Sequence, residues 1–122
     1  LPDYLLGSND GNVLSGSRGM DRLEARGGDD TLIGGAQNDN LKGGPGEDVF
    51  VLNVGDGADL IADWQDGLDR IDLSDFGLSF ASIETLATDL PIGALLIDLG
   101  GGDSFQINSF ASADFDSGDV IV

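Results

Sequence analysis

The sequence contains no cysteine and no histidine, and only 5 of its 122 residues are lysine or arginine. Without cysteine, the chain can form no disulfide and offers no thiolate as a nucleophile or metal ligand. Without histidine, it lacks the most common general base and the most common transition-metal ligand. The basic residues are outnumbered by 23 acidic ones, and the net charge is −18. We therefore expect no nucleic acid and no anionic membrane as a partner, because both carry charge of the same sign.

Long apolar runs are also missing. The sequence has no stretch of about 18 apolar residues, and it begins Leu1-Pro2-Asp3 without a charged and then apolar leader. We therefore predict neither a signal peptide nor insertion into a membrane. A length of 122 residues supports one domain, or one domain with a small appendage. We expect the chain to be a fragment of a longer protein.

Aspartate and glycine are abundant instead. There are 20 aspartates beside only 3 glutamates, 20 glycines, and 40% apolar residues. A disordered acidic chain uses glutamate freely and carries few apolar residues, so this composition allows a buried core. Short carboxylates beside glycine-rich turns are typical of oxygen-rich cation sites, and Ca²⁺ is the cation that suits them.

The sequence repeats with a period of nine. From Gly7 to Val51 it divides into GSNDGNVLS, GSRGMDRLE, ARGGDDTLI, GGAQNDNLK and GGPGEDVFV. Position six holds Asn12, Asp21, Asp30, Asp39 and Asp48, and position eight holds Leu14, Leu23, Leu32, Leu41 and Phe50. The frame extends backwards to Asp3 and Leu5. Positions one to five predict a sharp turn, and positions seven to nine predict a short strand whose middle side chain points inward.

These nonapeptides resemble the G-G-x-G-x-D-x-U-x calcium-binding repeat of the RTX family over residues 3–51. The departures are Ala25-Arg26 in place of the glycine pair, Gln37 at position four, and Asn12 in place of aspartate. The resemblance implies a right-handed parallel β-roll in which two nonapeptides make one coil, so that loops 18 residues apart stack. It pairs Asp3 with Asp21, Asn12 with Asp30, Asp21 with Asp39, and Asp30 with Asp48.

The resemblance also implies a Ca²⁺ ion between each stacked pair, with roughly four to six ions in all. Backbone carbonyls of positions one to four would complete each site, and the glycines assigned to them are Gly19, Gly28, Gly35, Gly44 and Gly46. One inward apolar side chain per repeat is a small core for so many glycine-rich residues. We therefore predict that residues 1–62 are disordered without calcium and become ordered when it binds. A glycine- and aspartate-rich linker that never orders, or a halophilic acidic surface, would not explain the regular spacing.

After Val51 the frame slips by two residues. Residues 55–61 still read G-x-G-x-D-x-U, which places Asp59 above Asp39, and residues 67–71 are a fainter echo. Residues 49–51 are apolar on both faces, so we expect this strand to be buried between the roll and the C-terminal half of the chain. The remaining sequence supplies a conventional aromatic core of Trp64, Phe76, Phe80, Phe105, Phe110 and Phe115.

We predict an all-β fold in two parts. Residues 1–62 form the calcium-binding β-roll, and residues 63–122 form a β-rich capping subdomain with one short helix. The apolar spacing predicts this helix over residues 79–90, ended by Pro91. Residues 94–99 and 104–108 are predicted to form a hairpin, and residues 120–122 a terminal strand.

The segments DRIDLSDFG and LIDLGGGD resemble the C-terminal region of serralysin-type RTX proteins. That resemblance implies a C-terminal signal read by a type I ABC-transporter secretion apparatus, and Asp119-Val120-Ile121-Val122 matches its acidic and then apolar ending. An ordinary edge strand explains the same residues, and the two interpretations are compatible. We therefore expect a secreted, monomeric, non-catalytic module that is joined to an upstream catalytic domain.

The resemblance makes a serralysin-like zinc metalloprotease the expected parent, although its H-E-x-x-H-x-x-G-x-x-H motif cannot lie in this histidine-free chain. The alternative is a module that binds an alginate-like polysaccharide, as in secreted epimerases or lyases, through a strip formed by Arg18, Arg22, Arg26 and Lys42. Catalysis by paired carboxylates is a third hypothesis, which calcium ligation by the spaced aspartates makes unnecessary.

Overall fold

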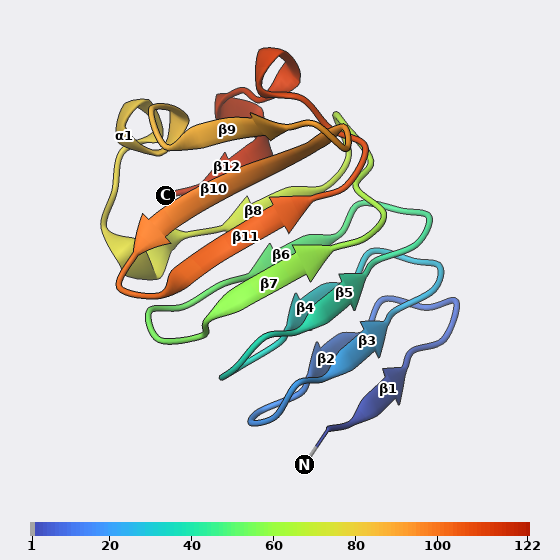
Figure 1. The fold of residues 1–122 in the computed structure, drawn as a ribbon. Helices are drawn as coiled ribbons and strands as arrows, with labels where there is room; N and C mark the ends of the chain where they lie inside the picture. Colours follow the sequence, from blue (N-terminus) through green and yellow to red (C-terminus); the bar gives the residue numbers. More distant parts are fainter. Residues whose placement is uncertain (1) are drawn as a thin grey trace.

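The computed structural model describes residues 2–122, which form a solenoid of two stacked β-sheets (Figure 1). Sheet A has seven strands in the order β1-β3-β5-β7-β11-β10-β9, and sheet B has five in the order β12-β8-β6-β4-β2. Consecutive strands alternate between the sheets from β1 to β8, so each coil adds one parallel strand to each sheet. The predicted all-β parallel roll is confirmed.

The strands are short in the repeats and longer in the C-terminal half. Sheet A contains β1 (Tyr4–Leu6), β3 (Arg22–Glu24), β5 (Asn40–Lys42), β7 (Ala58–Ile61), β9 (Ala87–Leu90), β10 (Ala94–Gly100) and β11 (Asp103–Ile107). Sheet B contains β2 (Val13–Ser15), β4 (Thr31–Ile33), β6 (Val49–Val51), β8 (Arg70–Asp72) and β12 (Val120–Ile121). The helical segments are α1 (Phe80–Glu84) and the 3₁₀ turns η1 (Ser74–Phe76), η2 (Ser112–Asp114) and η3 (Ser117–Asp119). Among residues 2–122, no helix is long and apolar enough to span a membrane.

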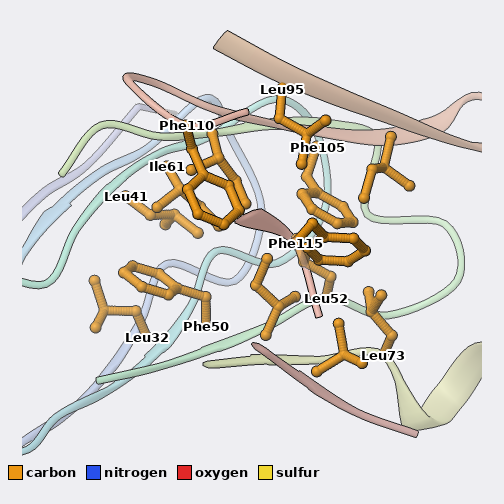
Figure 2. Close-up of a cluster of buried hydrophobic side chains, with 14 of the residues drawn as sticks. Leu32, Leu41, Phe50, Leu52, Ile61, Leu73, Leu95, Phe105, Phe110 and Phe115 are labelled. Atoms are coloured by element: carbon orange, nitrogen blue, oxygen red, sulfur yellow. The ribbon is translucent and has the colours of Figure 1, made fainter. Parts of the chain in front are cut away.

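Position eight of each repeat builds the core between the sheets. Parallel pairing sets Leu23 beside Leu41 in sheet A and Leu32 beside Phe50 in sheet B, and all four side chains are fully buried. Figure 2 shows this column continuing into the aromatic residues of the C-terminal half. The register follows from the period of two along a strand, because a slip of one residue would turn these side chains to the solvent.

The predicted helix over residues 79–90 is wrong beyond its first turns. Ser79 caps α1 as its hydroxyl oxygen accepts the N–H of Ser82, but residues 87–90 form β9, which pairs antiparallel with β10. Gly93 closes the intervening turn at a φ of +80°, with its N–H donating to Leu90 O. A helix of this length is marginal in water, whereas pairing with the long strand β10 satisfies the backbone of residues 87–90.

The expectation that residues 49–51 are buried on both faces is also wrong. Phe50 is fully buried, but Val49 and Val51 are only half-buried. The reason is that β8 and β12 extend sheet B sideways rather than covering its outer face. The β10–β11 hairpin is confirmed and lies beside β7 in sheet A. Both sheets therefore contain strands from before and after residue 62. The division of the chain at that residue stays a prediction.

Candidate metal centre

The loops that connect the strands stack in two rows along the sides of the roll. Edge A, the row that leads into sheet A, contains residues 16–21, 34–39 and 52–59. Edge B, the row that leads into sheet B, contains residues 7–12, 25–30, 43–48 and 62–69. Each loop ends at the aspartate or asparagine of position six, or at its equivalent, so these side chains are stacked as well.

The stacked position-six residues are joined by one repeated hydrogen bond, in which the N–H of the lower residue donates to Oδ1 of the aspartate above. On edge A the bonds run from Asp3 to Asp21 (2.7 Å), from Asp21 to Asp39 (2.8 Å), and from Asp39 to Asp59 (2.9 Å). On edge B they run from Asn12 to Asp30 (2.6 Å), from Asp30 to Asp48 (2.9 Å), and from Asp48 to Asp69 (3.0 Å). The pairing expected from the 18-residue spacing is therefore present on both edges, and Asp59 lies above Asp39 as the slipped frame predicts.

The second oxygen of most of these carboxylates has no partner. Within residues 2–122, Oδ2 is buried and accepts no hydrogen bond in Asp21, Asp30, Asp39, Asp48 and Asp59. These five residues are only 1–4% exposed. A buried carboxylate oxygen without a hydrogen bond or a counter-charge is strongly unfavourable. The two edges therefore each contain a row of oxygens that require a positive partner.

The pKa values of these carboxyl groups also indicate that their negative charge lacks a positive partner. Burial raises the pKa of Asp39 to about 6, that of Asp48 to about 7 and that of Asp59 to about 8. Hydrogen bonds from the backbone act in the opposite direction, and neighbouring carboxylates raise these pKa values further. No lysine or arginine offsets the burial, so the metal-free fold disfavours the charged form of each group.

The backbone of the loops is equally regular. Positions two and four have a positive φ in each loop from residue 16 to residue 48, whether or not the residue is glycine. The angles are +74° and +127° at Ser17 and Gly19, +73° and +92° at Arg26 and Gly28, +93° and +82° at Gly35 and Gln37, and +84° and +118° at Gly44 and Gly46. The departures from glycine at Arg26 and Gln37 therefore strain the loop without changing its path.

Glycine is required where a carbonyl oxygen of the loop below lies directly against it. A Cβ at Gly35 would overlap the carbonyl oxygen of Ser17, one at Gly44 that of Arg26, and one at Gly46 that of Gly28. The carbonyls of positions two and four thus point at the next loop of the same edge. Carbonyl and carboxylate oxygens therefore gather between the stacked loops.

This set of atoms fits calcium. Among residues 2–122, no three carboxylates converge on one point, so an ion must take its other ligands from the backbone. Ca²⁺ accepts six to eight oxygens and uses carbonyls readily, whereas Mg²⁺ demands a tighter octahedron and keeps its waters. Residues 16–59 contain three stacked loop pairs in which both loops have both left-handed residues. They are 16–21 with 34–39, 25–30 with 43–48, and 34–39 with 54–59.

Asp69 was not among the ligands assigned from the sequence, although it occupies the ladder above Asp48. The sequence pattern that could have identified Asp69 is the weak repeat in residues 67–71. Asp69 lies 21 residues after Asp48, whereas the regular interval is 18. At the opposite end, Asp3 is exposed and Asn12 is half-buried, and each has no loop of residues 2–122 stacked below it.

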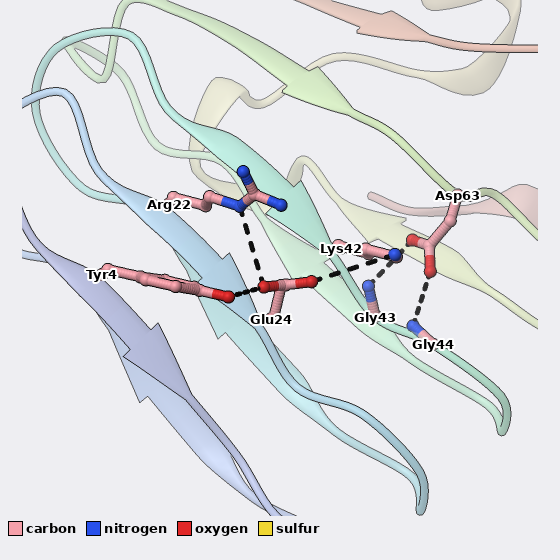
Figure 3. Close-up of polar contacts among 7 residues, drawn as sticks. All are labelled: Tyr4, Arg22, Glu24, Lys42, Gly43, Gly44 and Asp63. Atoms are coloured by element: carbon pink, nitrogen blue, oxygen red, sulfur yellow. Dashed lines mark hydrogen bonds and ion pairs between the residues drawn. The ribbon is translucent and has the colours of Figure 1, made fainter.

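The basic side chains do not all lie in one strip. Arg22 and Lys42 form ion pairs of 3.7 and 3.8 Å with Glu24, which also accepts the hydroxyl of Tyr4 (Figure 3). Arg26 lines a pocket of about 200 Å³ beside Glu24 and Lys42. Arg18 is separate, because it belongs to a loop of edge A, whereas Arg26 belongs to edge B.

Comparison with known proteins agrees with the loop geometry. A family model of the RTX calcium-binding nonapeptide repeat, which contains four copies, matches residues 6–41, 15–50 and 24–61. Residues 6–61 are RTX calcium-binding nonapeptide repeats. RTX repeats form a non-catalytic structural module and are typical of secreted proteins that use type I export. The sequence matches none of the curated proteins with which it was compared.

Solved structures show that the fold extends beyond the RTX repeats. The AlgE6R3 subunit of the Azotobacter vinelandii mannuronan C5-epimerase superposes with a TM-score of 0.79 at 24% identity, covering 98% of this chain and 77% of that one. The AlgE6R2 subunit of the same enzyme gives 0.64 at 25% identity, with 96% and 91% covered. The extracellular lipase LipA of Serratia marcescens gives 0.73 at 20% identity over 98% of this chain, which spans 20% of the lipase.

Substituting Gly35 separates the effect of loop contact from that of backbone strain. Gly35 and Gly55 both have a φ of +93°, but a Cβ at Gly35 overlaps the Ser17 carbonyl, whereas one at Gly55 meets no atom within 4 Å. Gly55→Ala is expected to lose only about 1–2 kcal/mol through strain. Both variants should raise the calcium concentration at which half of the chains are folded. The increase is expected to be much larger for Gly35→Ala than for Gly55→Ala, because the new Cβ pushes two loops of edge A apart. Circular dichroism during a calcium titration measures both, and equal shifts for the two variants would contradict the packing of these loops.

Acid should partly replace calcium. Because the pKa values of Asp39, Asp48 and Asp59 are raised in the metal-free fold, the folded state binds more protons than the unfolded state between about pH 4 and pH 8. The stability of the metal-free fold therefore rises as the pH falls through this window and is lost as the pH rises. In chelator, acidification from pH 8 to pH 5 is expected to increase β content. The double variant Asp48→Asn/Asp59→Asn should respond less, and an equal response, or a loss of structure on acidification, would refute the assignment.

Proposed function

We propose that this chain is a calcium-dependent folding module of a larger secreted protein. It remains unfolded at the low calcium concentration of the cytosol and folds when it meets the higher concentration outside the cell. The observation that supports this proposal most strongly is the set of five buried Oδ2 atoms that lack any partner. Weak sites, with dissociation constants of about 10⁻⁴–10⁻³ M, are typical of extracellular calcium modules and suit such a switch.

The negative charge of the chain explains why calcium is required for folding and does not simply bind to a chain that has already folded. The chain has a net charge of −18, and folding brings its aspartates into two rows. Each bound Ca²⁺ neutralises two of these charges and supplies the missing partner of a buried oxygen. Because the unfolded chain has no preformed site, the binding free energy contributes directly to folding. The expected number of ions stays roughly four to six, of which three correspond to the regular loop pairs.

The parent protein is proposed at two levels. The general proposal is a secreted enzyme, supported by the likeness to modules of an epimerase and to a part of an extracellular lipase. The finer proposal, a serralysin-like metalloprotease, depends on the resemblance of residues 69–77 and 96–103 to that group. The polysaccharide-binding alternative is supported by the pocket beside Arg26 and Lys42, but Glu24 neutralises part of the charge that a polyanion would require.

The C-terminal residues support the proposal that export precedes folding. Val120 is buried in β12, which pairs with β8, and Asp119 is buried with its Oδ2 accepting the N–H of Asp116. We propose that these residues carry the signal for a type I ABC transporter. Since Val120 and Ile121 are part of sheet B in the folded protein, we propose that the transporter reads the signal before calcium folds the chain.

The calcium switch is tested by changing one ladder aspartate. In Asp39→Asn the amide oxygen still accepts the N–H of Asp21, so the backbone ladder is kept while the charge beside two loop pairs is lost. The matched control is Asp114→Asn, because Asp114 is exposed in the turn η2 and belongs to neither row of stacked loops. We expect the wild-type chain to lack β structure in chelator, and Asp39→Asn to need about tenfold more calcium, equivalent to roughly 1.4 kcal/mol. A fully folded chain in chelator, or identical behaviour of the two variants, would disprove the proposal.

The secretion signal is tested in cells that contain a type I transporter. Deleting Asp119–Val122 is expected to stop export of the chain, whereas Ile92→Ser, in an exposed turn, should leave export unchanged. The deletion is informative even if it weakens the folded state, because the exported chain is proposed to be unfolded. Normal secretion of the shortened chain, measured in the culture medium, would show that the signal lies elsewhere.

A further inference from the structure

The uppermost loop of edge B, residues 62–69, differs from the loops below it because its carboxylates are already paired. Oδ1 of Asp69 accepts the N–H of Asp48 at 3.0 Å, as the ladder requires. Its Oδ2 accepts the N–H of Gln65 at 2.8 Å. The five ladder aspartates of residues 21–59 each leave this second oxygen buried without a partner, so Asp69 does not need a cation in the way that they do.

Asp63 fastens the same loop to the one beneath it. Its Oδ1 accepts the N–H of Gly43 at 2.9 Å, and its Oδ2 accepts the N–H of Gly44 at 2.7 Å (Figure 3). Both oxygens of this half-buried carboxylate are thus bound by backbone donors. Hydrogen bonds from N–H groups to a carboxylate are charge-assisted and stronger than neutral ones. Asp63 therefore joins loops 43–48 and 62–69 without a metal.

The side chain of Gln65 lies against two carbonyl oxygens of loop 43–48. In the loops below, the carbonyls at the same two positions are the ones proposed to face a cation. With its amide oriented to satisfy both partners, Nε2 donates to the carbonyl oxygens of Gly44 and Gly46, each at 3.0 Å. These are positions two and four of their loop. The equivalent carbonyls one coil lower, those of Arg26 and Gly28, instead face Gly44 and Gly46.

We propose that Gln65, supported by Asp63, takes the place of a calcium ion between loops 43–48 and 62–69. The inference rests on the proposed function, since it presumes that ions bind between the lower loops. An amide NH₂ has two donors and so satisfies the two carbonyl oxygens that a cation would otherwise coordinate. A cation there would meet the N–H groups of Gln65 and would find no free carboxylate oxygen on Asp63 or Asp69. In the folded chain the top of edge B is therefore closed without calcium.

Edge A ends differently. Its uppermost ladder residue, Asp59, has an unpaired Oδ2, and Gly55 and Gly57 supply the left-handed residues found in the lower loops. Burial raises the pKa of Asp59 to about 8, in agreement with an oxygen that lacks a partner. The metal series on edge A therefore reaches the pair 34–39 with 54–59, above which both oxygens of Asp103 accept the N–H groups of Gly55 and Gly57. On edge B it stops below the loop 62–69.

The variant Gln65→Glu tests this assignment, because a carboxylate cannot donate to the carbonyls of Gly44 and Gly46 and restores the need for a cation. Native mass spectrometry of the 122-residue chain in calcium is expected to show one more bound ion in Gln65→Glu than in the wild type. Terbium emission sensitised by Trp64, the single tryptophan and the residue adjacent to Gln65, should rise in the same variant. The matched control is Gln106→Glu on β11, where the Gln106 side chain donates a hydrogen bond to that of Asn108, and it should leave the ion count unchanged.

An equal ion count in the wild type and in a folded Gln65→Glu variant would overturn the inference. Should the variant fail to fold, the wild type decides alone. In the calcium-saturated wild type, NMR should detect scalar coupling across the hydrogen bonds from Gln65 Nε2 to the carbonyl carbons of Gly44 and Gly46. Absence of this coupling would equally overturn it. A wild type that binds no calcium at all would instead refute the proposed function, so the two failures are distinguishable.

Discussion

The structure depends on one unmet interaction, the buried carboxylate oxygen that five of the stacked loops leave without a partner. Hydrogen bonds from the backbone satisfy Oδ1 of the ladder aspartates from Asp21 to Asp69, and these bonds join the stacked loops. In the five aspartates from Asp21 to Asp59, Oδ2 is enclosed by the same loops and accepts no hydrogen bond from residues 2–122. The hydrogen bonds between the stacked loops are therefore formed, but the negative charge of the buried carboxylates is not balanced. A divalent cation would balance this charge and would also contact the unpaired oxygens.

This incompleteness divides the molecule into two kinds of structure. In the repeats, a single column of apolar side chains such as Leu32 and Phe50 lies between strands of three residues, and the edges are held by charged groups. In the C-terminal half, longer strands and the packed rings of Trp64 and Phe110, with centroids 5.7 Å apart, supply an ordinary hydrophobic core. The two halves share both sheets, so the order of the C-terminal half is coupled to that of the half that depends on calcium.

Much of this architecture is predictable from the period of nine. The period of two within each short strand fixes which side chain is buried, and two repeats per coil fix which aspartates stack, as Asp21 and Asp39 show. The prediction weakens where the period changes. The ladder position of Asp69 was missed because it follows Asp48 by 21 residues and not by 18. The residues of β9 have helical spacing, but they form a strand because they pair with β10. The role of Gln65 cannot be predicted from the sequence, because it depends on which carbonyls its amide reaches after the loops have stacked.

If cations lie between the stacked loops of both edges, a crystal grown in calcium, or exchanged with terbium, will reveal them by anomalous scattering. We expect two rows of anomalous peaks, each beside an Oδ2 atom of the ladder and among carbonyls of positions two and four, with no peak beside Gln65. Peaks confined to the outer surface, with Asp30, Asp39 and Asp48 in contact with none of them, would contradict it.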